Sequence, residues 1–178
     1  MIVLCRFLLG PGCSLVAAAG QQSKESILKI AHQFANEHKY REAFSVLSQG
    51  IIKHSKDVDL YYLRAKISQY SSDIDQAIKD YTETINLSPR KYPKAYQHRA
   101  ECFYRLKMYI YVIYDTTKCL KLMPRYAKAY MLRGKAYAKI GKVRKAIENI
   151  QKAVRLAPGY ARAANQLITK IYEGQGNF

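Results

Sequence analysis

The sequence has 178 residues, of which 49% are hydrophobic, so it is long enough for a buried core and too apolar for an intrinsically disordered chain. Nine Gly and five Pro are too few for a turn-rich β-sandwich or barrel. Lys and Arg number 30 against 13 Asp and Glu, a formal net charge of +17. Residues 1–91 contain 12 basic and nine acidic side chains, whereas residues 92–178 contain 18 and four. The positive charge therefore lies in the second half, where it indicates an acidic partner.

Residues 1–23 differ from the rest of the chain. They contain one basic residue, Arg6, and no acidic residue, and their apolar stretch is broken at residues 10–12 by Gly-Pro-Gly. This interruption argues against a transmembrane span, which needs about 20 unbroken apolar residues. The small residues 17–20 resemble a signal-peptidase site, although residues 1–5 lack the charge that a signal peptide has before its apolar stretch. Two interpretations stay open, a cleaved secretory or organellar targeting segment and an atypical or disordered N-terminus. The expected location is the cytoplasm, or a mitochondrion or other organelle if residues 1–19 are cleaved.

After this segment the chain repeats one pattern. Pro89, Pro124 and Pro158 are spaced 35 and 34 residues apart, and each follows a similar apolar ending. Within each copy, apolar residues recur at helical spacing in two segments of about a dozen residues. A proline ends the second segment because it has no amide hydrogen and its ring clashes with the preceding turn. The pattern therefore predicts tandem helix-turn-helix units.

The predicted units follow one another from residue 24. The first unit matches the pattern most weakly, since it has no proline at its end. In the second unit, Asp73 is predicted to cap a helix by accepting hydrogen bonds from free amides. The predicted copies are residues 24–57, 58–91, 93–126 (after an inserted Tyr92) and 127–160, followed by a capping helix at 161–173 and a tail at 174–178.

These copies resemble the tetratricopeptide-repeat family, whose units are 34 residues long. The copy at 127–160 fits the family pattern best, with Tyr130, Gly134, Tyr137, Gly141, Ala146, Ala153 and Pro158 at the matching positions. The resemblance implies an all-α solenoid of four repeats plus a C-terminal capping helix. Small residues such as Gly134 and Ala146 are expected where the two helices of one repeat approach closely. The resemblance predicts an architecture and no particular reaction.

In this family the first helices line a concave groove that binds peptides or partner helices. The resemblance places Glu25, Leu28, His32 and Asp59 there in the first part of the chain. The candidate partner-binding residues are Tyr62, Lys66, Lys94, Gln97, His98, Glu101, Lys128, Met131 and Lys135.

One subclass of the family clamps the acidic tail of heat-shock chaperones with Lys, Arg and Asn side chains. The matching positions hold Leu28, His32, Leu63, Lys94 and His98 in one register and Tyr62, Lys66, His98, Lys128 and Leu132 in the other. Both registers lack the amides that orient a carboxylate, so the resemblance argues against this clamp.

The sequence contains no recognisable catalytic constellation. Its four histidines share no metal-ligand spacing, and it has no phosphate-binding glycine loop or nucleophile elbow. Cys102 and Cys119 fall inside helical patterns, and Cys5 and Cys13 fall in the apolar N-terminal segment, so reduced thiols are expected. We expect no enzyme, cofactor or metal site.

Residues 116–170 carry 14 Lys and Arg and a single acidic residue, Glu148. An acidic protein surface, RNA or an anionic membrane would each fit this charge. Lys142, Arg144 and Lys145 are the candidate anion or RNA contacts, because they open a helix whose dipole favours anions there. The favoured function is a non-enzymatic adaptor or assembly factor, similar to a co-chaperone, that binds an acidic segment of a protein partner. The alternative is an RNA-associated subunit of a ribonucleoprotein complex.

The repeat pattern changes at Tyr109–Tyr114, where the charged positions of the other copies have become Ile or Tyr. Tyr109 and Ile113 are expected to face the core, whereas Ile110, Tyr111 and Tyr114 are expected to point outward on the convex side. Three adjacent apolar side chains would form a patch. One hypothesis is a second docking site, for a partner subunit or a second copy of the chain. The other is an ordinary solvated surface.

Overall fold

The structure, a computed structural model, describes residues 23–174. All regular secondary structure in this range is helical, which confirms the predicted all-α fold. The predicted targeting segment, Cys5 and Cys13 lie outside the described residues, as do residues 175–178 of the predicted tail. The helices form two compact units divided between Ser88 and Pro89. We call residues 23–88 the N-terminal unit and residues 89–174 the C-terminal unit.

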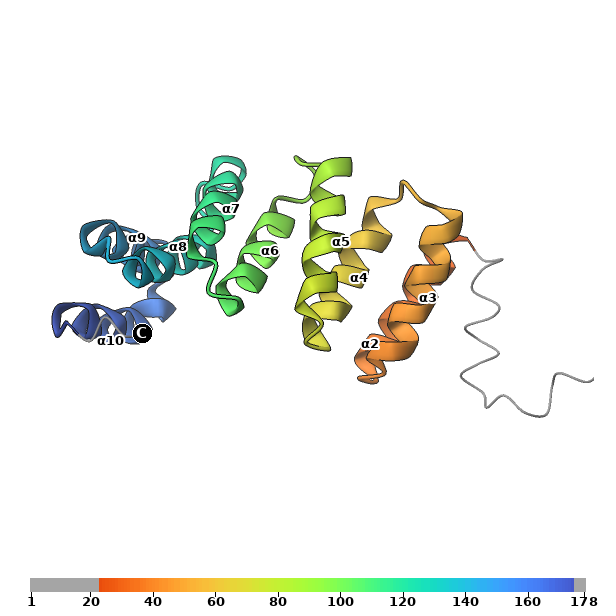
Figure 1. Cartoon of the computed structure of the whole chain (residues 1–178), viewed down its shortest axis with the longest axis horizontal. Coiled ribbons are helices and arrows are strands. Elements are labelled where there is room, and N and C mark those ends of the chain that lie inside the picture. The colour runs from red at the N-terminus through yellow and green to blue at the C-terminus, as the bar shows by residue number, and fades with distance from the viewer. Residues whose placement is uncertain (1–22, 175–178) are drawn as a thin grey trace, which may run out of the picture. The chain divides into compact units, whose positions relative to one another are not determined.

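Each unit is built from antiparallel helix pairs packed side by side (Figure 1). The N-terminal unit contains α2 (Lys24–Asn36), α3 (Tyr40–Lys53), α4 (Val58–Tyr70) and α5 (Ile74–Leu87). The C-terminal unit contains α6 (Pro93–Arg105), α7 (Tyr109–Leu122), α8 (Ala127–Lys139), α9 (Val143–Leu156), a short 3₁₀ turn η1 (Pro158–Tyr160) and α10 (Ala161–Tyr172). We call α2, α4, α6 and α8 the first helices and α3, α5, α7 and α9 the second helices.

Short polar side chains begin several of these helices. The Asp73 carboxylate accepts a hydrogen bond from the Gln76 amide at 3.1 Å, which confirms its predicted role as the N-cap of α5. Asp57 accepts from the amides of Asp59 and Leu60 and so caps α4 in the same way. Such a cap satisfies backbone donors that have no partner inside the helix.

The turn inside each helix pair contains one residue in the left-handed region. His38, Ser72, Lys107 and Gly141 have φ values of 58°, 66°, 60° and 72°. These positions are 34, 35 and 34 residues apart, so the backbone of the turn recurs with the period of the sequence. Only the last copy has glycine, the residue that adopts this conformation without steric cost.

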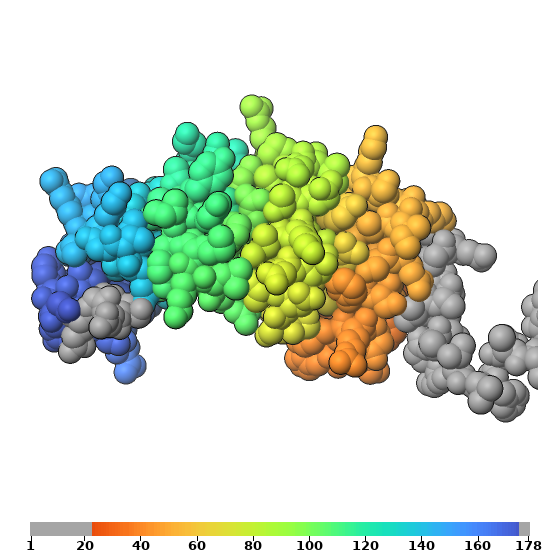
Figure 2. All heavy atoms as spheres, viewed as in Figure 1, coloured from red at the N-terminus to blue at the C-terminus, as the bar shows by residue number. Residues whose placement is uncertain are grey.

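The core of the C-terminal unit requires very close helix packing. A Cβ atom on Gly134 would lie 2.8 Å from Ile150 Cγ1 and 3.1 Å from the carbonyl oxygen of Ala146. The absence of a side chain at Gly134 thus brings α8 against α9, as the sequence predicted for Gly134 and Ala146. Within each unit, side chains fill the space between the neighbouring ribbons of Figure 1 (Figure 2).

The structure also bears on the cysteines and on membrane association. Cys102 and Cys119 are buried and free, and burial raises the pKa of their thiols to about 12 and about 11. Both thiols are therefore protonated near neutral pH, which makes them poor nucleophiles. Among residues 23–174, no helix combines the length and the hydropathy that crossing a bilayer requires.

Candidate partner-binding faces

The N-terminal unit has a cleft of about 400 Å³ bounded by α2, α4 and the turn that leads into α3. Aromatic side chains from the turn and from the adjoining helices form one wall of the cleft. The Nδ1 atom of His38 lies 2.9 Å from the Tyr40 hydroxyl, and the Tyr40 ring stacks on Tyr70 with 6.2 Å between centroids. The polar side chains that line the cleft include His32, Asn36, His38 and Lys66.

Lys66 is the one candidate partner-binding residue that lines this cleft. It has no ion pair with any described residue, so its ammonium group is free to meet an anion. The other candidate on α4, Tyr62, is half-buried and packs edge-on against the ring of Tyr81. The sequence did not identify Asn36, Tyr40 or Tyr70 as lining a site, because the cleft depends on how the turn between α2 and α3 folds.

The acidic groups near the start of α4 are neutralised within the unit. Lys24 forms ion pairs with Asp57 and Asp59, at 2.8 and 2.5 Å. Hydrogen bonds to these two carboxylates raise the pKa of Lys24. The negative charge that the sequence placed at Asp59 is therefore balanced by α2.

In the C-terminal unit, three of the candidate partner-binding residues gather around the carboxylate of a fourth. Glu101 accepts hydrogen bonds from Gln97 Nε2 at 3.2 Å, His98 Nδ1 at 3.2 Å and Lys128 Nζ at 2.7 Å. Burial raises the pKa of Glu101, but the bonds from His98 and Lys128 outweigh burial and lower the pKa to about 2. Lys128 is consequently engaged by its own chain, and a partner would have to compete with Glu101 for it.

The candidate residues on α6 and α8 also differ in their exposure to solvent. Lys94 and Lys135 are exposed and have no ion pair with the described residues. Gln97 is fully buried. Met131 is also buried and belongs to an apolar cluster with Ile150 of α9 and with residues of α10, so the structure places it in the core rather than on a groove surface.

The three cations predicted as an anion or RNA contact differ in their surroundings. Arg144 bonds Glu148 at 3.1 Å on the exposed surface of α9. The ammonium group of Lys145 lies 5.8 Å from the centre of the Tyr137 ring. Lys142 is exposed at the N-cap of α9, and its side chain makes no capping bond. Two of the three are thus already held by neighbouring side chains.

The apolar positions of α7 lie as the sequence predicted. Ile110, Tyr111 and Tyr114 are 65%, 54% and 57% exposed, whereas Tyr109 and Ile113 pack against the buried cluster of α6, α7 and α8. The three exposed side chains line an open cleft of about 480 Å³ together with Arg99, Phe103 and Asp115.

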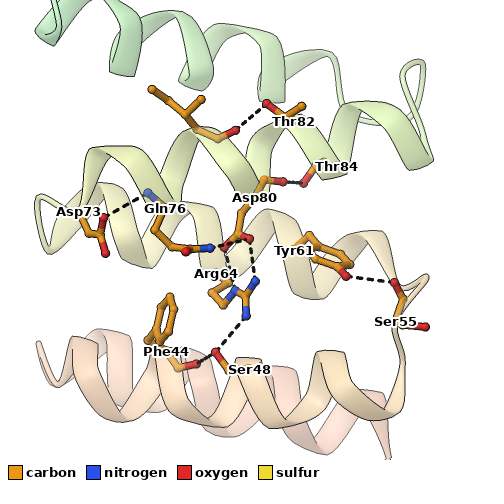
Figure 3. Close-up of polar contacts among 11 residues, drawn as sticks. Phe44, Ser48, Ser55, Tyr61, Arg64, Asp73, Gln76, Asp80, Thr82 and Thr84 are labelled. Atoms are coloured by element: carbon orange, nitrogen blue, oxygen red, sulfur yellow. Dashed lines mark hydrogen bonds and ion pairs between the residues drawn. The ribbon is translucent and has the colours of Figure 1, made fainter.

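A buried arginine–carboxylate pair recurs between first and second helices, and sequence reasoning missed it. In the N-terminal unit, Arg64 donates from Nε and Nη2 to the two oxygens of Asp80, both at 2.8 Å, and from Nη1 to Ser48 Oγ at 3.0 Å (Figure 3). In the C-terminal unit, Arg99 donates to both oxygens of Asp115 at 2.8 Å. The recurrence of Arg64, Arg99 and Arg133 at the repeat period was a signal that could have revealed the pairing.

Comparisons with known proteins agree on the architecture. A family model described as a tetratricopeptide repeat matches residues 127–160. The crystal structure of MamA protein superposes with a TM-score of 0.80 at 21% identity, over 90% of this chain and 84% of that one. The fold is that of a tetratricopeptide-repeat protein.

Two further solved tetratricopeptide-repeat structures cover about two thirds of this chain. The first TPR of Spaghetti (RPAP3), bound to the HSP90 peptide SRMEEVD, has a TM-score of 0.62 at 24% identity and covers 66% of this chain and 92% of its own. The TPR2B domain of yeast Sti1, in a pHsp70 complex, has a TM-score of 0.61 at 24% identity and covers 66% and 97%.

The part of the chain that the structure describes shows no arrangement for metal chemistry. Residues 23–174 contain no group of three or more His, Cys, Asp or Glu side chains placed to hold a metal ion. Of the histidines of the N-terminal cleft, His38 contacts the Tyr40 hydroxyl, and His32 lines the cleft together with Asn36 and Lys66. These side chains can donate to an anion or accept from a polar ligand.

Proposed function

We propose that this tetratricopeptide-repeat chain is a non-enzymatic adaptor or assembly factor that binds an acidic segment of a partner protein on its first helices. The observation that carries the proposal is that three candidate partner-binding lysines on these helices, Lys66, Lys94 and Lys135, lack a carboxylate partner among the described residues. A carboxylate that meets such a cation forms a charge-assisted hydrogen bond, which is stronger than a neutral one.

The cleft of the N-terminal unit is the best-formed site for such a segment. Lys66 supplies a positive charge, and His32 and Asn36 line the same cleft and can donate hydrogen bonds. The stacked rings of Tyr40 and Tyr70 provide an apolar wall beside these polar groups. An acidic side chain flanked by an apolar one matches this combination.

The proposed recognition differs from the carboxylate clamp of chaperone-binding relatives. The neighbour RPAP3 was solved with a peptide, SRMEEVD, that contains three acidic residues, which supports an acidic ligand for this fold. In this chain, however, Lys128 is engaged by Glu101, and the clamp positions hold no asparagine. We therefore assign the binding determinants to Lys66 in the N-terminal unit and Lys135 in the C-terminal unit, and of these only Lys66 is also a clamp position.

The first prediction tests these two lysines in the full chain. Random peptides displayed on phage are selected against the protein, and acidic sequences are expected to be enriched. The affinity of a selected peptide is then measured by fluorescence anisotropy. The double variant Lys66→Glu with Lys135→Glu should weaken binding at least about tenfold, because each substitution replaces a charge-assisted contact with repulsion.

The control carries the same change of charge on exposed positions of the second helices, Lys79→Glu with Arg155→Glu, and should alter the affinity less than about threefold. Equal losses in the two double variants would contradict a first-helix site. RNA is tested in the same assay with oligouridylate. Tight oligouridylate binding with a steep salt dependence, and no enrichment of acidic peptides, would instead favour the RNA-associated alternative.

A further inference from the structure

The buried arginine–carboxylate pair changes at its third occurrence. Arg133 occupies the position of Arg64 and Arg99, but the residue 16 positions later is Asn149 instead of Asp80 or Asp115. Arg133 Nε donates to Asn149 Oδ1 at 2.8 Å, and Arg133 Nη1 donates to Thr117 Oγ1 at 3.1 Å. One of the two bonds that a carboxylate would accept is therefore missing.

The missing bond leaves Arg133 Nη2 without an acceptor among the described residues. The amide nitrogen of Asn149 is itself a donor, to the backbone carbonyl of Lys145 at 2.8 Å, so it cannot accept a hydrogen bond from Arg133. The Nη2 atom is not enclosed, and it reaches solvent. Asn149 is itself partly exposed, whereas Asp80 and Asp115 are only 2% and 1% exposed. The side chain that faces the arginine is therefore almost inaccessible to solvent in the two preceding pairs and partly accessible here.

The surroundings of this position carry excess positive charge. Lys118 and Lys121 lie within about one turn of Thr117 on α7, and Lys145 and Lys152 lie within about one turn of Asn149 on α9. The nearby carboxylate, Glu148, is bonded to Arg144. Burial lowers the pKa of the Arg133 guanidinium, which nevertheless stays protonated at neutral pH.

An apolar surface adjoins these cations on α7. Tyr114 lies one turn before Thr117, its ring is contacted by the ammonium group of Lys118 at 5.2 Å, and Ile110 lies one turn further back. The outer side of α7 is thus apolar in its first half and cationic in its second half.

We infer that Arg133 is the binding position for a carboxylate side chain of a partner protein, supplied by an acidic segment with apolar residues that docks across α7 and α9. The two preceding copies show which group the position takes, since in both the arginine is bridged by a side-chain carboxylate. The apolar residues of the segment cover Ile110 and Tyr114. This surface is separate from the first-helix site and does not depend on it.

A side-chain carboxylate fits this position better than RNA. Arg133 is half-buried between two helices, so a carboxylate on a flexible stem reaches it more readily than a phosphate within a backbone. RNA binding relies on several exposed phosphate contacts and on bases stacked on exposed rings.

The second prediction uses Asn149→Asp, which supplies the missing carboxylate from the chain itself. The probe is a fluorescein-labelled peptide in which Glu alternates with Leu, measured by anisotropy at physiological salt. All proteins carry Lys66→Glu and Lys135→Glu, so that these two lysines do not contribute to binding. Asn149→Asp should weaken binding at least about tenfold and raise the melting temperature, because Arg133 gains a bidentate partner.

The matched control is Gln151→Asp, which adds the same charge at an exposed position two residues along α9. It should change affinity less than about threefold and leave the melting temperature unaltered. A higher melting temperature with unchanged binding in Asn149→Asp would overturn the inference, as would equal losses of binding in the two variants. Binding of oligouridylate in place of the peptide would also overturn it, in favour of RNA on this face.

Discussion

Two carboxylates of the C-terminal unit show how the place of a residue in the fold determines its pKa. Asp115 is 1% exposed, and although Arg99 bridges both its oxygens, burial dominates and raises its pKa. Glu101 accepts from three side chains, and its pKa falls to about 2. The raised pKa of Asp115 means that the ion pair with Arg99 does not fully offset the cost of burying the carboxylate. Glu101 stabilises the unit mainly through its ionised form.

The third prediction follows from the pKa of Glu101. Because folding lowers this pKa from 4.5 to about 2, the carboxylate contributes stability that is complete above about pH 4.5 and is lost as the pH falls toward 2. The contribution amounts to at most about 3 kcal/mol. Urea unfolding between pH 6 and pH 2 should therefore show a smaller acid-dependent loss of stability in Glu101→Gln than in the unsubstituted chain. The exposed control Glu148→Gln should follow the unsubstituted chain, and a Glu101→Gln curve of unchanged shape would contradict the assignment.

The helices are the scale at which the sequence was most informative. Apolar periodicity and the recurring prolines predicted the all-α fold, and the helix cap at Asp73 followed from the residue type. The ion pairs between side chains were harder to predict from the sequence. The ion pair of Lys128 with Glu101 joins α8 to α6, and that of Arg64 with Asp80 joins α4 to α5. Each pair depends on the packing angle of its own two helices, which no local pattern specifies. For the same reason, the sequence placed Met131 on a surface that the packing of α10 converts into core.

The fourth prediction compares Gly50 and Gly134, two buried glycines at which neighbouring helices pack closely. Alanine is intrinsically better in a helix than glycine by about 1 kcal/mol. At Gly50 a Cβ would lie 2.9 and 3.2 Å from the Cγ2 and Cδ1 methyl groups of the Ile27 side chain, and the three nearest atoms include no backbone atom. At Gly134 it would also meet the backbone of Ala146 and Ile150 at 3.1 and 3.2 Å, which cannot move without separating α8 from α9.

Gly134→Ala should therefore lower the free energy of unfolding by about 1–3 kcal/mol, whereas Gly50→Ala should change it by less than about 1 kcal/mol in either direction. Urea titration followed by circular dichroism measures both. A Gly134→Ala protein as stable as Gly50→Ala would show that the backbone contact between α8 and α9 does not limit packing.

At the scale of the whole molecule, charge is divided unevenly between the two units. Residues 23–88 carry nine basic and nine acidic side chains, whereas residues 89–174 carry 20 basic and four acidic ones. Three of these four acids, Glu101, Asp115 and Glu148, are already held in ion pairs within the unit. Most cations of the C-terminal unit thus repel one another, and this repulsion favours binding of an acidic partner at some cost in the unit's own stability.

The fifth prediction concerns this repulsion and uses the N-terminal unit as an internal control. Raising the salt concentration from about 10 to about 150 mM shortens the screening length from about 30 to about 8 Å, so like charges on separate helices interact less. Hydrogen exchange followed by mass spectrometry should then show slower exchange in α6–α9, where the net charge is positive, and little change in α2–α5, where charges balance. Salt screens the buried ion pair of Arg99 with Asp115 only weakly. This attraction is therefore retained and does not cancel the stabilisation that comes from reduced repulsion. Faster exchange in α6–α9 at higher salt would mean that attractive surface pairs, rather than repulsion, dominate the electrostatics of this unit.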